Sequence, residues 1–189
     1  MSKLNRLSLI AAAVGALVFA APASAAVTSF STILTSAGEP VPTSTATGAA
    51  VVSFDDLANT VTVLLSFSGL NIAPGATAGP FGHIHCCTAT PSTGSAGVAL
   101  NFTALPIAAT GSYVAILSSG YTTGNSFASL LAGANAGRAY VNIHTPGTYG
   151  AGEIRGFLPA IPEPSTYAMF LAGLGLVGLM WRRRAARQA

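Results

Sequence analysis

The stretch YVNIHTPGTYGAGEIRGF, residues 140–157, decides the fold expected for this chain. In its first run, Val141, Ile143 and Thr145 alternate with polar or aromatic residues, which is typical of a half-buried strand. The second run places Ile154 on the same inward face, and the residues between the two runs are rich in glycine, which favours a turn. If the runs pair as a hairpin, four polar side chains gather on its outer surface as a candidate site: Asn142, His144, Glu153 and Arg155.

Outward from this hairpin, residues 26–160 are rich in Thr, Ser, Val, Ala and Gly and show short alternating runs separated by turn residues. This pattern predicts an all-β domain. One segment, 126–133, instead has apolar residues at helical spacing and predicts a single short helix. The strands are expected over residues 27–35, 48–54, 60–67, 98–102 and 111–117, with a further run at 81–87.

The charge distribution limits the classes of partner. Only 7% of the residues are charged, and the net charge of +3 comes from basic residues near the two ends. Between residues 26 and 160 there are two basic residues, Arg138 and Arg155, and four carboxylates, so this part is mildly acidic. The sequence therefore predicts no nucleic-acid partner, although its isoelectric point is basic.

The N-terminus has the pattern of an export signal. Lys3 and Arg6 precede an apolar run, and Ala23-Ser24-Ala25 has the small residues that signal peptidase requires. Residues 1–25 are accordingly predicted to be a removed signal peptide.

The C-terminal segment, residues 161–189, combines three features: the triplet Pro162-Glu163-Pro164, an apolar run and an arginine cluster. Residues 165–181 are predicted to form a transmembrane helix with the arginines on the cytoplasmic side. The combination resembles the PEP-CTERM sorting signal of Gram-negative bacteria. That resemblance implies export across the inner membrane, recognition by an exosortase, and delivery to the cell surface or an exopolysaccharide matrix. A membrane anchor without cleavage is the alternative.

The central domain resembles the CHRD domain, first described in chordin. Five blocks follow in the order of that family, at residues 39–42, 67–70, 82–85, 139–145 and 152–156. The resemblance implies an immunoglobulin-like Greek-key β-sandwich over residues 26–160, and it implies no established catalytic activity.

The histidines form a candidate metal site. His83 and His85 stand two apart, so on a strand they share a face, and His144 is the third histidine of the chain. Imidazoles suit copper or zinc, and a thiolate from Cys87 would add to such a site. The alternative is that each histidine is hydrogen-bonded to a loop carbonyl or a carboxylate. The His-x-His strand is also locally similar to that of Cu/Zn superoxide dismutase, but the other ligands of that enzyme have no counterpart here.

Cys86 and Cys87 are the only cysteines, and export would take them into an oxidising compartment. A vicinal disulfide in a turn is the leading expectation, ahead of an intermolecular bond, a metal site or two free thiols.

Glu153 and Arg155 stand two apart on the expected outer face. We expect Arg155 to pair with Glu153, Asp55 or Asp56 and hold the hairpin in register; the alternative makes Glu153 a carboxylate that orients His144. The sequence contains no convincing catalytic motif. It therefore predicts a non-enzymatic structural or binding module at the cell surface, with extracellular polysaccharide or protein as partner. The alternative is an extracytoplasmic copper or zinc protein, with redox activity, that uses the three histidines.

Overall fold

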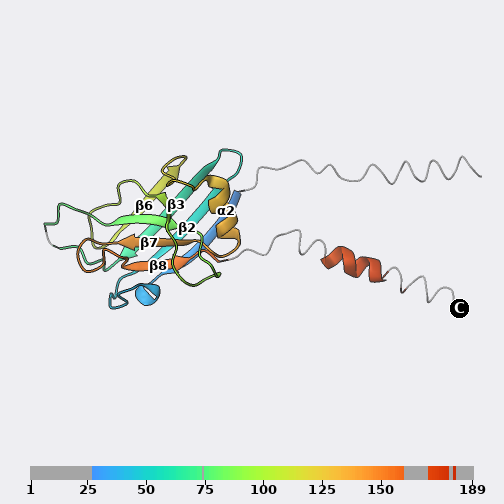
Figure 1. Cartoon of the computed structure of the whole chain (residues 1–189), viewed down its shortest axis with the longest axis horizontal. Helices are drawn as coiled ribbons and strands as arrows, with labels where there is room; N and C mark the ends of the chain where they lie inside the picture. Colours follow the sequence, from blue (N-terminus) through green and yellow to red (C-terminus); the bar gives the residue numbers. More distant parts are fainter. Residues whose placement is uncertain (1–26, 74, 160–169, 179–180, 182–189) are drawn as a thin grey trace, which may run out of the picture.

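The computed structural model describes residues 27–73, 75–159, 170–178 and 181 (Figure 1). The predicted signal peptide, residues 1–25, and the Pro162-Glu163-Pro164 triplet lie outside these residues. The described part confirms the all-β class, since it consists mainly of two antiparallel four-stranded sheets with a short helix.

Each sheet combines strands from distant parts of the chain. The first has the order β1-β2-β3-β6 and the second the order β5-β4-β7-β8. The strands of the first sheet are β1 (Val27–Leu34), β2 (Thr47–Asp55), β3 (Thr60–Ser68) and β6 (Gly111–Leu117). Those of the second sheet are β4 (Phe81–His85), β5 (Val98–Asn101), β7 (Tyr140–His144) and β8 (Ile154–Phe157).

The alternation along the strands builds the core of a β-sandwich. In β3, Val61, Val63, Leu65 and Phe67 are buried, while the residues between them are more exposed. They join one apolar cluster that also contains residues of β4, β7 and β8, so the cluster lies between the two sheets. Burying each of these side chains contributes about 1.5–3 kcal/mol. The more specific expectation of an immunoglobulin-like Greek-key topology stays a prediction.

The helix α2 (Phe127–Asn135) forms where the sequence predicted one. Ser126 accepts a hydrogen bond from the backbone N–H of Ser129, and the Ser129 side chain accepts one from the backbone N–H of Ser126, which completes a capping box. Phe127, Leu130 and Ala134 are buried against the sandwich, as their spacing indicates. A single 3-10 turn, η1 (Ser36–Gly38), follows β1.

One expectation about the hairpin is wrong. Its polar residues were expected on an open outer surface, but all five residues of β7 are buried. The reason is that loops fold over this face of the second sheet. Ala96 of the loop between β4 and β5 contacts His85, and Gly150 of the loop between β7 and β8 contacts His144.

Residues 170–178 and 181 are helical, and their large apolar side chains are exposed. No helix within the described residues is both long enough and apolar enough to cross a membrane. The transmembrane helix expected over residues 165–181 is therefore not confirmed.

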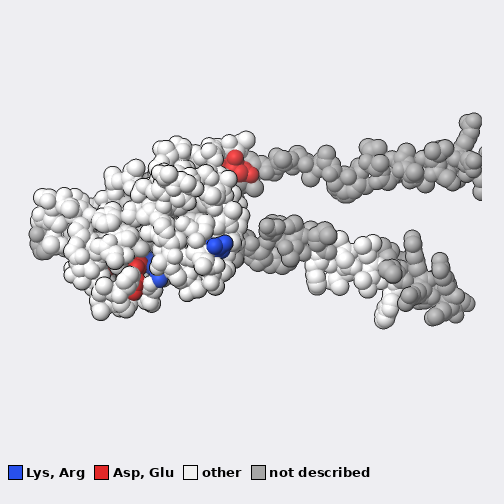
Figure 2. Space-filling model, viewed as in Figure 1, with Lys and Arg blue, Asp and Glu red and all other residues white. Residues whose placement is uncertain are grey.

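Charged side chains are sparse on the surface of the sandwich. Figure 2 shows a face on which small groups of basic and acidic atoms stand among mostly uncharged residues.

Candidate metal centre

Two neighbouring strands bring the three histidines together. His83 and His85 alternate along β4, and therefore project from the same face. In the antiparallel register of β4 and β7, His83 lies opposite Asn142, and His144 is two residues further along β7. Cross-strand and diagonal neighbours of this kind lie within reach of each other's side chains. The prediction that the fold gathers these histidines is thus supported by the geometry.

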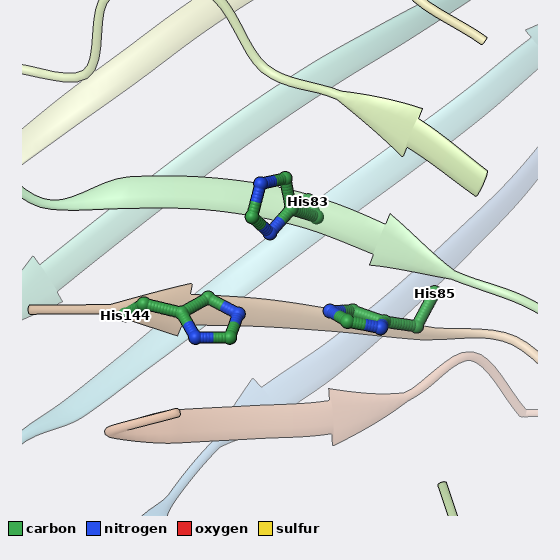
Figure 3. Close-up of side chains that lie close together, drawn as sticks. All are labelled: His83, His85 and His144. Carbon is green, nitrogen blue, oxygen red and sulfur yellow. The ribbon is translucent and has the colours of Figure 1, made fainter. Parts of the chain in front are cut away.

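The imidazoles form a compact triangle (Figure 3). One nitrogen from each ring can be chosen so that all three lie within 4.8 Å of one another. The ring centroids of His83 and His144 are 5.1 Å apart, and those of His83 and His85 are 5.6 Å apart. The three rings can therefore hold a single metal ion.

Loop carbonyls fix the orientation of two rings. Nδ1 of His85 lies 2.9 Å from the carbonyl oxygen of Ala96, and Nδ1 of His144 lies 3.1 Å from that of Gly150. Because a carbonyl only accepts, each Nδ1 carries the proton and donates it, which leaves the lone pair on Nε2. The two alternatives from the sequence are therefore compatible: in each of these rings Nδ1 donates to a loop carbonyl, and Nε2 is left to bind a metal.

Each ring also has one buried nitrogen without a partner. Among the described residues, Nε2 of His85, Nε2 of His144 and Nδ1 of His83 are each inaccessible to solvent and lack a hydrogen bond. Leaving a polar atom in this state typically costs about 1–3 kcal/mol. Three such atoms facing one another are readily explained by a shared ligand, since a metal ion would satisfy all of them.

Burial also keeps the histidines neutral. Desolvation, together with the neighbouring His144 and His85, lowers the pKa of His83 to about 4. Desolvation likewise lowers the pKa of His85 and of His144, partly offset by the hydrogen bonds to Ala96 and Gly150. At neutral pH all three rings are therefore neutral, each with one N–H and one nitrogen lone pair, which is the form that binds metal.

Aromatic rings hold the histidines from both sides. The Phe81 ring stacks on His144 with centroids 5.1 Å apart, and Tyr140 stacks on His85 at 4.7 Å. The guanidinium of Arg155 lies 5.0 Å from the centre of the Tyr140 ring. Such packing limits rotation of the imidazoles and preorganises the site.

Cys87 does not join the cluster. Cys86 and Cys87 form a disulfide, as the leading expectation had it, and β4 ends before them at His85. Both sulfur atoms lie against Gly133 of α2, where an added Cβ would collide with them. The disulfide therefore packs against the helix, and the expected thiolate ligand from Cys87 is wrong.

Glu153 and Arg155 have other partners than the sequence suggested. The carboxyl oxygens of Glu153 accept hydrogen bonds from the Ser44 and Thr145 hydroxyls and from the backbone N–H of Asn71. Glu153 is fully buried in this network, while the ring nitrogen of His144 is oriented by Gly150. The alternative that Glu153 orients His144 is therefore wrong. Arg155 donates to Gly94 and Ser95.

Glu39 is a feature of this face that the sequence did not reveal. Its carboxyl group is buried, and desolvation raises its pKa to about 7, with Arg155 acting in the opposite direction. Within the described part of the chain, Oε1 of Glu39 and Oδ1 of Asn142 are both buried acceptors without a partner. A lone glutamate in a proline-flanked loop of a charge-poor chain was the available signal.

Comparison with known families agrees with this architecture. The family model of the CHRD domain matches residues 30–158. The chain belongs to the CHRD domain family. All three histidines and both cysteines fall within the CHRD match. The model of the PEP-CTERM protein-sorting motif matches residues 160–184, which implies an extracytoplasmic protein sorted by an exosortase in a Gram-negative bacterium. No curated protein and no solved structure matches the chain.

Proposed function

We propose that this CHRD protein is displayed at the cell surface or in the exopolysaccharide matrix and binds a copper or zinc ion through His83, His85 and His144. The observation that carries the proposal is the convergence of the three imidazoles. One nitrogen of each ring lies within 4.8 Å of the others, and among the described residues each ring also has a buried nitrogen without a hydrogen-bond partner. The protein is a non-enzymatic module in this proposal, since its chemistry lies in holding the ion.

The donor set selects the class of metal. Neutral imidazoles suit zinc and copper, whereas magnesium and calcium take oxygen ligands. Three protein ligands leave one position of a tetrahedral ion open. A redox role requires copper, because zinc has a single oxidation state. The identity of the bound metal therefore decides whether the protein only holds the ion or can also transfer electrons.

The test uses the full chain, exported in a Gram-negative host that has an exosortase and recovered without a polyhistidine tag. Because the chain has only three histidines, every imidazole signal from a bound metal comes from this cluster. We expect about one equivalent of copper or zinc after dialysis against a micromolar supply, and none in the variant in which all three histidines are replaced by glutamine. A wild-type protein that takes up neither metal would disprove the proposal.

Surface display is tested separately by deleting residues 162–189. We expect the truncated protein to accumulate in the periplasm and the full chain at the surface. The same location for both would contradict sorting through the C-terminal segment, whatever the metal content.

A further inference from the structure

The residue that lies in the middle of the histidine cluster is Asn142. It sits on β7 between Tyr140 and His144 and directly opposite His83 on β4, and it projects from the same face as these residues. Its side chain is only 2% exposed, and none of the residues that the structure describes donates a hydrogen bond to its Oδ1. A buried amide oxygen without a donor is energetically unfavourable, so a bound group that donates a hydrogen bond to Oδ1 would stabilise this arrangement.

Glu39 indicates which way the amide is turned. An added Cβ on Gly152 would lie 3.0 Å from Nδ2 of Asn142 and would also collide with the Glu39 carboxyl group. Nδ2 and the carboxyl group therefore share one side of Asn142, as expected for an amide donor beside an acceptor. Since Oδ1 and Nδ2 point in opposite directions from the planar amide, we infer that Oδ1 is turned away from Glu39 and towards β4, where His83 lies opposite Asn142.

We propose that a water molecule fills the fourth position of the bound metal and donates a hydrogen bond to Oδ1 of Asn142, which makes this an open metal centre that exchanges small ligands. This inference rests on the proposed metal binding. A water on a divalent ion is a strong donor because the ion polarises it. Direct ligation by the amide oxygen suits copper and zinc less well, since carbonyl oxygens favour harder ions.

Exchange with solvent requires an opening beside the metal. His83 is the least buried of the three histidines, and Phe81, which stacks on His144, is 42% exposed. The open position is therefore reached at the Phe81 and His83 side of the cluster. Small ligands such as water and azide could reach the metal from this side.

The experiment loads the full chain with Cu(II) and compares electron spin-echo spectra in H₂O and D₂O. Wild-type protein should show imidazole nitrogen couplings and the modulation of an exchangeable, metal-bound water. Asn142→Leu has a similar volume but no acceptor, and should keep the nitrogen couplings while losing the water signal. Asn101→Leu is the matched control, because Asn101 lies opposite His83 on its other neighbouring strand, β5; it should retain both signals.

Three outcomes separate the two proposals. A wild-type protein without bound copper or zinc overturns the metal site itself. A loaded wild type without an exchangeable water overturns the open position, and an Asn142→Leu variant with an unchanged water signal overturns the role of Asn142; neither result touches the metal site itself. Should the leucine variant fail to fold, azide decides with wild-type protein alone, since azide should displace the water signal and its failure to do so contradicts an open position. Asn142→Asp, which keeps an acceptor oxygen, should retain the water.

Discussion

Tyr140 and His85 lie face to face, with ring centroids 4.7 Å apart and ring planes within 2° of parallel. The same two residues also share a partner, because the carbonyl oxygen of Ala96 lies 2.9 Å from Nδ1 of His85 and 3.4 Å from the Tyr140 hydroxyl. Tyr140 therefore both supports the imidazole and holds the loop that orients it.

This relationship predicts a graded response to substitution of Tyr140. Tyr140→Phe keeps the stacked ring but loses the contact with Ala96, and should weaken metal binding by less than about 10-fold. Tyr140→Leu removes the stack as well and should weaken it by about 10–100-fold. Competition titration with a chromophoric chelator measures both affinities. Equal affinities for both variants and the wild type would show that Tyr140 does not position His85.

Gly133 should be intolerant of a side chain. Ala is favoured over Gly in a helix by about 1 kcal/mol, so an unobstructed Gly133→Ala would stabilise the protein. An added Cβ here would collide with the sulfurs of Cys86 and Cys87, so we expect destabilisation by about 1–3 kcal/mol instead. Urea unfolding measures the change. Gly97→Ala, where an added Cβ meets nothing within 4 Å, is the control.

The cause of that loss can be isolated with a double-mutant cycle. In a Cys86→Ala/Cys87→Ala background the obstructing sulfurs are absent, so Gly133→Ala should no longer destabilise the protein. An unchanged penalty in this background would locate the strain elsewhere in α2.

Glu153 should matter for stability and not for metal binding. Glu153→Ala leaves the Ser44 and Thr145 hydroxyls and the backbone N–H of Asn71 without their acceptor, so we expect a loss of about 3 kcal/mol in unfolding free energy. Metal affinity of the folded variant should stay within about twofold of wild type, since loss of a group that orients a metal ligand weakens binding by more than this. A 10-fold loss of affinity with unchanged stability would restore Glu153 as a partner of His144.

The low pKa of His83 predicts a pH-dependent stability of the metal-free protein. Its pKa is about 4 in the folded chain against an ordinary value of 6.5, so between these values the unfolded chain binds more protons. The unfolding free energy contributed by His83 therefore rises as the pH increases from about 4 to 6.5 and is constant above 6.5.

The measurement is urea unfolding of the wild type and of His83→Gln in the presence of a chelator. The stability difference between them should change across this pH window and be flat above it. Glu39, whose pKa is raised to about 7, makes stability fall as the pH rises, whereas His85 and His144, whose pKa values are lowered, act in the same direction as His83. Both proteins contain these three groups, so the comparison isolates His83. A difference that does not vary with pH would contradict the burial of His83.

Local sequence patterns were sufficient for most of the elements. The run at Gly111–Leu117 was predicted with the bounds of β6, because a short run of residues that favour strands, bounded by turn residues, defines a strand. The face shared by His83 and His85 followed from the same period. The helix could be located because Phe127, Leu130 and Ala134 recur at helical spacing.

The covering of the histidine face was not predictable in this way. It depends on Ala96 and Gly150, which lie in loops without periodic signals, and on Glu39, which reaches this face from the start of the domain. The prediction that Glu153 lies on the outer face failed because it assumed regular alternation where the backbone is irregular. The preceding Gly152 has a positive φ of 135°, and the regular alternation of β8 starts only after it, at Ile154.

The scarcity of charge on the sandwich has a kinetic consequence. Without extended patches of one sign, a partner approaching this domain is not steered electrostatically, so its association rate should lie near the unsteered range of about 10⁵–10⁶ M⁻¹s⁻¹. That rate should also vary little with ionic strength, because there are few charges to screen. A protein displayed outside the cell would thus meet its partners at similar speed in dilute and in saline surroundings.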